Sequence, residues 1–420
     1  MDLPGAAHLM LAARVIHLDF ASAVFDAMVD GWGLQQRVRF LDENDTWLDS
    51  RSSWRSVSGS LSGPARAGTM ACVDRIPNGR LSEADIALLD ALHANPRASF
   101  EKLAATLGVA PVTVARRWRR LNEAGQAWVS SVPSPRLAMS GAVCEIEPDP
   151  GRAVPVAAAL ATLPQVISVY LTSNQYAVHT IVLADELDKL TMLLLEVIPE
   201  VPGALRVRSH LGTQWLSGAR WRLGAITGSQ RSSVTGTEAG DGRAETARTL
   251  VFDNQERELY LALQHDGRVG YRELARQLGI PEHQVRRQTE SLLRRGMLTF
   301  RTDFARPEGG WPTELVLWLS VPHDRVEQVG LQLAEWPETR IALATIGSAN
   351  LLVMAQLHQI GEVGRLRARL AEVDRGTVVV DESVVLRPVK SWGRLLGAAG
   401  HAVGVVPVDP WSAPFADFHH

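Results

Sequence analysis

Residues 88–125 read LLDALHANPRASFEKLAATLGVAPVTVARRWRRLNEAG, and residues 259–296 read LYLALQHDGRVGYRELARQLGIPEHQVRRQTESLLRRG. The two stretches align without a gap at a constant offset of 171 residues (259 − 88 = 171), and 12 of their 38 positions are identical. Chance identity at ordinary composition would give about two or three. Most of the identical positions are apolar or glycine, so what is repeated is first of all a fold.

Each copy predicts three helices with apolar residues at helical spacing. In the first copy they cover 83–93, 99–107 and 111–124, and in the second 254–265, 271–278 and 282–295. Gly108 suits the left-handed position after a helix end, and Pro111 suits a first helical turn. The short turn between them contains glycine, which indicates a helix-turn-helix.

A second pattern follows each copy, with strands and helices in the order βαββαβ. In the first unit the elements are expected at 140–147, 154–163, 166–171, 176–183, 187–198 and 205–216, and in the second at 315–321, 326–335, 340–345, 351–357, 363–372 and 377–386. This order is that of the ferredoxin-like plait. The predicted fold class is therefore α+β, with a winged or tri-helical helix-turn-helix domain and a plait, each present twice.

These elements predict seven regions along the chain. They are an N-terminal extension that is partly helical or disordered (1–78), a first helix-turn-helix domain (79–138), a first plait (139–223), a linker (224–248), a second helix-turn-helix domain (249–307), a second plait (308–396) and a flexible tail (397–420).

The overall composition is that of a globular protein, with 46% hydrophobic residues, 21% charged residues and a net charge of −3. Two cysteines are too few for a disulfide framework. No apolar run reaches transmembrane length and no secretory leader is visible, so we expect a cytoplasmic protein without a membrane partner. No metal or cofactor motif is apparent, and neither is expected.

The third helix of the first copy carries the clearest functional signal. Val114, Trp118 and Leu121 form its apolar face, so its arginines lie off that face. Residues 97–136 hold seven basic and two acidic residues, a local charge of +5 (7 − 2 = 5). Such residues neutralise DNA phosphates, and the N-terminal part of this helix reads bases in the major groove. The predicted DNA contacts are Pro111, Val112, Thr113, Arg116, Arg117 and Arg120 in the first copy, with Gln284, Arg286 and Arg287 in the second. Acidic residues dilute the charge of the second copy, so the first is expected to bind DNA more strongly.

The segments 81–85, 104–109, 112–117 and 121–125, followed by a plait, resemble the Lrp/AsnC (feast/famine) family of transcriptional regulators. The resemblance covers roughly 80–221 and again 250–392. It implies a sequence-specific regulator that binds double-stranded promoter DNA, forms homo-oligomers through its plaits and responds to a small effector such as an amino acid. Two units in one chain then imply a built-in pseudo-dimer.

In the family, the turn between the second and third plait strands commonly carries a Gly-x-x-Asp-like pattern. The corresponding turns here, 172–175 and 347–350, lack the acid. The polar residues that remain as effector ligands are Ser173, Asn174, Ser348 and Asn350, although they are also ordinary turn residues.

Two other functions stay open. Sirohaem decarboxylases resemble the same two-part architecture, and His179, Arg208 and His210 lie on predicted plait strands. No established catalytic motif accompanies them, so we expect no enzyme activity. The other alternative is an assembly module without DNA binding, which the arginines of the first copy disfavour.

Overall fold

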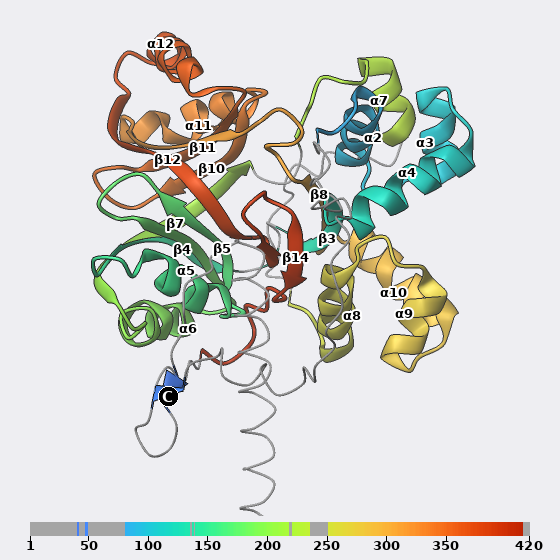
Figure 1. The fold of residues 1–420 in the computed structure, drawn as a ribbon, viewed down its shortest axis with the longest axis horizontal. Coiled ribbons are helices and arrows are strands. Elements are labelled where there is room, and N and C mark those ends of the chain that lie inside the picture. Colours follow the sequence, from blue (N-terminus) through green and yellow to red (C-terminus); the bar gives the residue numbers. More distant parts are fainter. Residues whose placement is uncertain are drawn as a thin grey trace, which may run out of the picture.

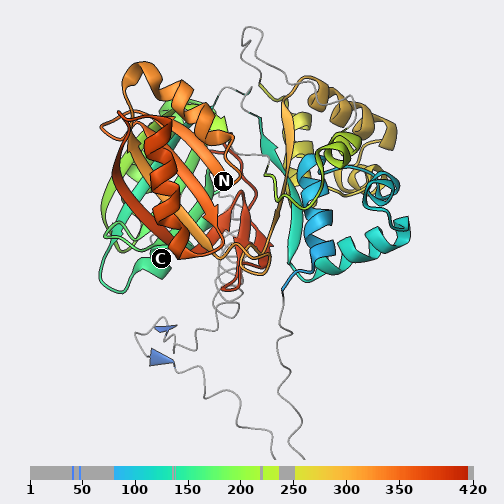
Figure 2. The ribbon, with the colours of Figure 1, turned by 90° about the horizontal axis from the view of Figure 1, so that it is seen from above.

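The computed structural model describes residues 80–134, 137, 139–217, 221–235 and 251–414, together with two short strands, β1 (Phe40–Leu41) and β2 (Trp47–Leu48). The predicted N-terminal extension lies outside the described residues apart from these strands, and so does the end of the linker. The plaits form one side of the molecule and the helix-turn-helix units the other (Figure 1). Figure 2 shows the same division from above. No helix of the described part is long and apolar enough to cross a bilayer.

The predicted helices of the first helix-turn-helix form within a residue or two of their expected bounds. They are α2 (Glu83–Ala94), α3 (Phe100–Leu107) and α4 (Pro111–Glu123). Ser82 caps α2 in a capping box with Asp85, and Ser99 caps α3. Gly108 adopts φ 68°, a left-handed conformation that glycine reaches without steric cost. The second unit repeats the order with α8 (Asn254–His265), α9 (Tyr271–Leu278) and α10 (Glu282–Arg294).

Two strands that were not predicted from the sequence join these units. They are β3 (Ala127–Pro133) and β8 (Leu298–Phe304), which pair antiparallel with Ala127 opposite Phe304 and Pro133 opposite Leu298. The apolar residues of both units form one continuous core. The two helix-turn-helix units are therefore one body, and their relative orientation is set within the chain.

The first plait contains β4 (Ser140–Pro148), α5 (Ala153–Ala161), β5 (Val166–Thr172), β6 (Val178–Ala184), α6 (Leu187–Met192) and β7 (Ala204–Ser217). The predicted helix over 187–198 ends as a π-helical turn, Leu193–Val197. The second plait contains β9 (Thr313–Ser320), α11 (Val326–Ala334), β10 (Thr339–Thr345), β11 (Leu351–Leu357), α12 (Val363–Val373) and β12 (Val378–Ser391).

The last strand of each plait also pairs with the other plait. β7 pairs with β4 and β10, and β12 pairs with β9 and β5. The order β12-β5-β6-β4-β7-β10-β11-β9 therefore returns to β12 and closes an eight-stranded barrel, in which β7 and β12 each pair with their own plait along one half and with the other plait along the other half. α5 and α6 cover the outside of the first plait and α11 and α12 that of the second, while a third apolar cluster fills the barrel.

Two expectations about the connecting segments were wrong. The start of the predicted linker forms a helix, α7 (Gly228–Thr235), which packs on α2 and α3. The predicted flexible tail contains β14 (Ala402–Val405), which pairs with β13 (Arg394–Leu396). The tail then docks on α8, where Gln264 exchanges two hydrogen bonds with the backbone of Val408. The chain thus returns to the preceding helix-turn-helix after each plait.

Candidate nucleic-acid interface

The helix-turn-helix of the first unit presents α4 with its apolar face inward. Val114, Trp118 and Leu121 are buried, as the helical spacing predicted. Pro111 starts the helix and is exposed, and the side chain of Val112 is 74% exposed. Thr113 is half-buried. Among the described residues, the first turn of α4, which would enter a major groove, is therefore open to solvent.

The arginines of α4 divide into two pairs. Arg117 and Arg120 both approach the buried carboxylate of Asp85, at 3.3 and 2.5 Å. Asp85 also accepts hydrogen bonds from the backbone and side chain of Ser82, so it links α4 to the start of α2. Both arginines are predicted DNA contacts, and both are paired with this carboxylate, Arg117 with 23% and Arg120 with 53% of its side chain exposed.

Arg116 and Arg119 remain exposed, and neither forms an ion pair within the described residues. They follow the open N-terminal turn along the outer side of α4. No acidic residue stands in the first turn of this helix. The interface that remains is thus smaller than predicted, but it keeps an uncompensated positive charge.

The corresponding surface of α10 is more acidic. Glu282 stands in its first turn, and Arg286 lies 3.5 Å from it. Arg287, at the position equivalent to Arg116, is exposed, and Gln284 is half-buried. Arg294 lies 3.9 Å from Glu290, so a second arginine of α10 is also opposed by a carboxylate of the same helix.

Two arginines at equivalent repeat positions join the units reciprocally. Arg97 donates to the backbone carbonyls of Gly267 and Val269. Arg268 donates to the carbonyls of Pro96 at 2.5 Å and Ala98 at 2.9 Å. The predicted basic residue Arg97 is therefore a structural contact between the two units rather than part of the exposed charge.

The predicted effector residues lie on the turns β5–β6 and β10–β11, each against the long strand of the opposite plait. Ser173 is exposed, and its hydroxyl accepts from the Val384 N–H at 3.0 Å. Asn174 is half-buried and Ser348 is exposed. Asn350 is buried and exchanges two hydrogen bonds with the backbone of Val321, just after the end of β9. Asn350 is thus a structural residue and not an effector ligand.

The side chains considered for a decarboxylase surround Glu145, which was not among the predicted site residues, and Arg208 keeps 42% of its side chain exposed. Glu145 is fully buried, and His179, His210 and Arg208 lie 3.1, 3.1 and 2.5 Å from its carboxylate. Trp318 Nε1 donates to the same carboxylate at 3.0 Å. Burial opposes ionisation, but the two histidines and Arg208 hold the pKa of Glu145 well below its usual range.

This arrangement satisfies one buried carboxylate with donors from several strands. Glu145 accepts hydrogen bonds from Arg208, His210 and Trp318, whereas Nε2 of His179 lies 3.1 Å from the carboxylate without hydrogen-bond geometry. In the described part of the chain, no group of three or more His, Cys, Asp or Glu side chains is arranged to hold a metal ion.

Comparison with known proteins places both domains of the first unit. The AsnC-type helix-turn-helix domain matches residues 81–122, and the Lrp/AsnC ligand binding domain matches residues 141–214. An uncharacterized HTH-type transcriptional regulator of Pyrococcus abyssi is 27% identical over 157 residues, which cover 36% of this chain and 96% of that protein. A similar regulator of Pyrococcus horikoshii is 26% identical over 151 residues, covering 35% of this chain and 93% of its own length.

Solved structures are similar at lower identity. The crystal structure of the siroheme decarboxylase NirDL has 16% identity and a TM-score of 0.48, covering 74% of this chain and 93% of its own. The structure of E. coli AsnC has 23% identity and a TM-score of 0.28, covering 32% of this chain and 93% of its own. Neither likeness is high enough to support an argument about activity. The matched domains identify the two parts of the first unit as an AsnC-type helix-turn-helix domain (81–122) followed by an Lrp/AsnC ligand binding domain (141–214).

Proposed function

We propose that this protein is a sequence-specific DNA-binding regulator whose main DNA contact is α4. The observation that carries the proposal is the exposed first turn of α4, followed by Arg116 and Arg119, which have no ion pair among the described residues. Arginine reads guanine with two hydrogen bonds, and an exposed valine can contact a thymine methyl group. Because β3 and β8 join the two units, α10 is held at a constant position relative to α4 and would contact a second, weaker half-site.

A selection from random duplex DNA tests this proposal, because it requires no known operator sequence. The full chain should enrich a sequence motif, and the variant Arg116→Ala/Arg119→Ala should lose that enrichment. The matched control is Arg206→Ala/Arg375→Ala, which removes the same charge from two exposed arginines outside the helix-turn-helix units. Enrichment by the α4 variant equal to that of the control would refute the proposal.

The decarboxylase alternative receives less support from the geometry. His179, Arg208 and His210 converge, but they do so around the buried carboxylate of Glu145. Adding sirohaem to the pure protein decides the matter, since binding shifts the Soret band and decarboxylation gives a new product. Turnover of sirohaem together with absent DNA enrichment would replace the regulator by the enzyme.

The partners beyond DNA remain part of the proposal. A small effector is expected from the ligand binding domain, with Ser173, Asn174 and Ser348 as the predicted ligands that the turns leave at or near the surface. The predicted homo-oligomer through the plaits would have to use their outer surfaces, because the two plaits of one chain already close the barrel together.

A further inference from the structure

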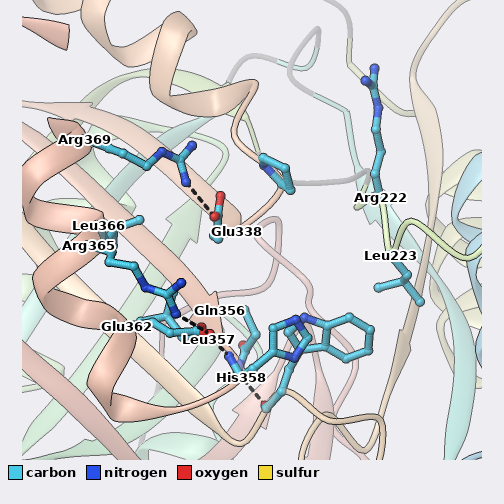
Figure 3. A pocket seen from close by; sticks show the side chains of 12 residues that line it. Arg222, Leu223, Glu338, Gln356, Leu357, His358, Glu362, Arg365, Leu366 and Arg369 are labelled. Carbon is cyan, nitrogen blue, oxygen red and sulfur yellow. Dashed lines mark hydrogen bonds and ion pairs between the residues drawn. The ribbon is translucent and has the colours of Figure 1, made fainter. Parts of the chain in front are cut away.

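A cavity of about 300 Å³ lies between the segment that follows the first plait and the outer helix of the second plait (Figure 3). Arg222 stands on one side of it, and Arg365 and Arg369 of α12 stand on the other. His358 borders its lower end, and Trp311 also lines it. None of the residues that line the cavity belongs to α4, to α10 or to the turns predicted to hold an effector.

The charges around the cavity do not balance. Arg369 pairs with Glu338 at 2.6 Å, and Arg365 pairs with Glu362 at 3.2 Å. Arg222 is exposed and forms no ion pair within the described residues. The lining holds three arginines and two glutamates, which leaves one positive charge (3 − 2 = 1) on the side of Arg222. An anion is therefore the ligand that this lining favours.

The lining also offers an aromatic surface. The rings of Trp311 and His358 lie 5.1 Å apart at an interplanar angle of 34°. His358 is kept in this position by a contact of 2.8 Å between its Nδ1 and the carbonyl oxygen of Gly310. Trp311 is half-buried and also contacts the ring of Trp221 edge to face, and this contact fixes the indole of Trp311 in place. Such a fixed pair of rings suits a flat ligand ring by stacking.

We propose that this cavity binds a small aromatic anion, with its ring against Trp311 and His358 and its carboxylate or phosphate near Arg222 and the arginines of α12. The volume is at the lower end of that of ligand pockets, which limits the ligand to about the size of a mononucleotide. The segment of Arg222 is attached to the first helix-turn-helix, since the Leu223 N–H donates to Asp90 of α2 at 3.1 Å. A bound anion would therefore connect that unit to the second plait.

Calorimetric titration of the full chain, without DNA, tests the proposal and does not depend on the regulatory function. Phenylacetate and adenosine monophosphate (AMP) are the two probes, and they distinguish a carboxylate from a phosphate ligand. Phenylacetamide and adenosine remove the charge, and cyclohexylacetate keeps the charge but lacks the aromatic ring. We expect at least one anionic probe to bind, and its neutral or non-aromatic analogue to bind about tenfold more weakly or not at all.

The variants Arg222→Ala and Arg365→Ala should each weaken that binding by about tenfold, because each removes a charge-assisted contact. Arg276→Ala is the matched control, since Arg276 is 73% exposed and pairs with Glu273 at i,i+3, as Arg365 is 74% exposed and pairs with Glu362 at i,i+3. It should leave the affinity unchanged. The proposal fails if neither anion binds at millimolar concentration, if the neutral or cyclohexyl analogues bind equally well, or if the cavity variants bind like the control.

Discussion

The two plaits occupy equivalent places in one barrel but present different chemistry to its centre. Strand pairing puts Glu145 opposite His179 and Arg208 in the first plait. In the second plait it puts Trp318 opposite Leu352 and Asp381. The first plait thus supplies a buried carboxylate, and the second supplies an indole N–H that donates to it at 3.0 Å.

This difference shows what a covalent pair of units permits. In a dimer of identical chains, a residue beside the two-fold axis faces its own copy, so a buried glutamate there would meet a second glutamate. Two carboxylates at one buried site cannot both stay ionised without a large cost. Joining two unequal units in one chain allows an acceptor to face a donor, and the same freedom allows α4 and α10 to differ in charge.

The largest expected effect comes from making the two plaits alike. Trp318→Glu would place a second carboxylate against Glu145 and remove the indole that packs on His210 with ring centroids 4.2 Å apart. We expect the free energy of unfolding to fall by more than about 4 kcal/mol. Denaturant unfolding measures this change. Trp318→Phe keeps an aromatic ring but removes the N–H donor and part of the buried ring volume, and should cost about 2–3 kcal/mol, so equal losses for the two variants would contradict the argument.

A smaller effect, with a defined pH dependence, is expected for Glu145→Gln. The folded state holds the pKa of Glu145 below the ordinary value of 4.5, so the carboxylate stabilises the fold above that pH and loses this contribution as the pH falls below it. The variant should be about 2 kcal/mol less stable at neutral pH. The difference from wild type should shrink below about pH 4, and Glu147→Gln on the same strand serves as the control. A difference that is constant from neutral to acid pH would show that Glu145 does not act through its charge.

The helices of both helix-turn-helix units could be predicted because apolar spacing and helix-ending residues are local features of the sequence. Gly108 adopts the left-handed conformation after a helix end that its position in the sequence indicated. β3 and β8 were missed because each pairs with a strand far along the chain, in the other helix-turn-helix unit. The order of the plait elements was visible from alternating apolar residues, whereas the exchange of β7 and β12 between plaits depends on long-range pairing.

The site was predictable to the same degree. The spacing of Val114, Trp118 and Leu121 correctly identified which face of α4 is buried. The spacing could not show that Arg117 and Arg120 pair with Asp85. Asp85 takes part in the capping box of α2, and nothing in the sequence indicated that it also pairs with arginines of α4. Glu145 was overlooked because a lone charge in a strand usually faces solvent. Its partners come from β6 and β7, which flank β4 in the first plait, and from β9 of the second plait.

α4 and α10 can be compared directly, because Arg116 and Arg287 occupy equivalent positions on them and are both exposed. Arg116→Ala should weaken binding to the selected DNA by about 1–3 kcal/mol, the usual contribution of an arginine that reads a base. Arg287→Ala should cost less than about 0.6 kcal/mol, as expected of an arginine on a surface diluted by carboxylates. Fluorescence anisotropy with the selected duplex measures both. Equal losses would show that the two units bind equivalent half-sites.

The smallest effect should come from relieving the acidity of α10. Glu282 is the counterpart of Pro111, and it lies 3.5 Å from Arg286. Glu282→Gln removes a negative charge beside the phosphates and frees that arginine, so DNA affinity should rise by about twofold and the salt dependence should become steeper by about one phosphate contact. Glu327→Gln makes the same charge change on α11, outside the reading units, and should alter neither quantity. If Glu282→Gln also leaves both unchanged, α10 does not approach the DNA backbone, and the second unit then serves to hold the first in place rather than to bind a half-site of its own.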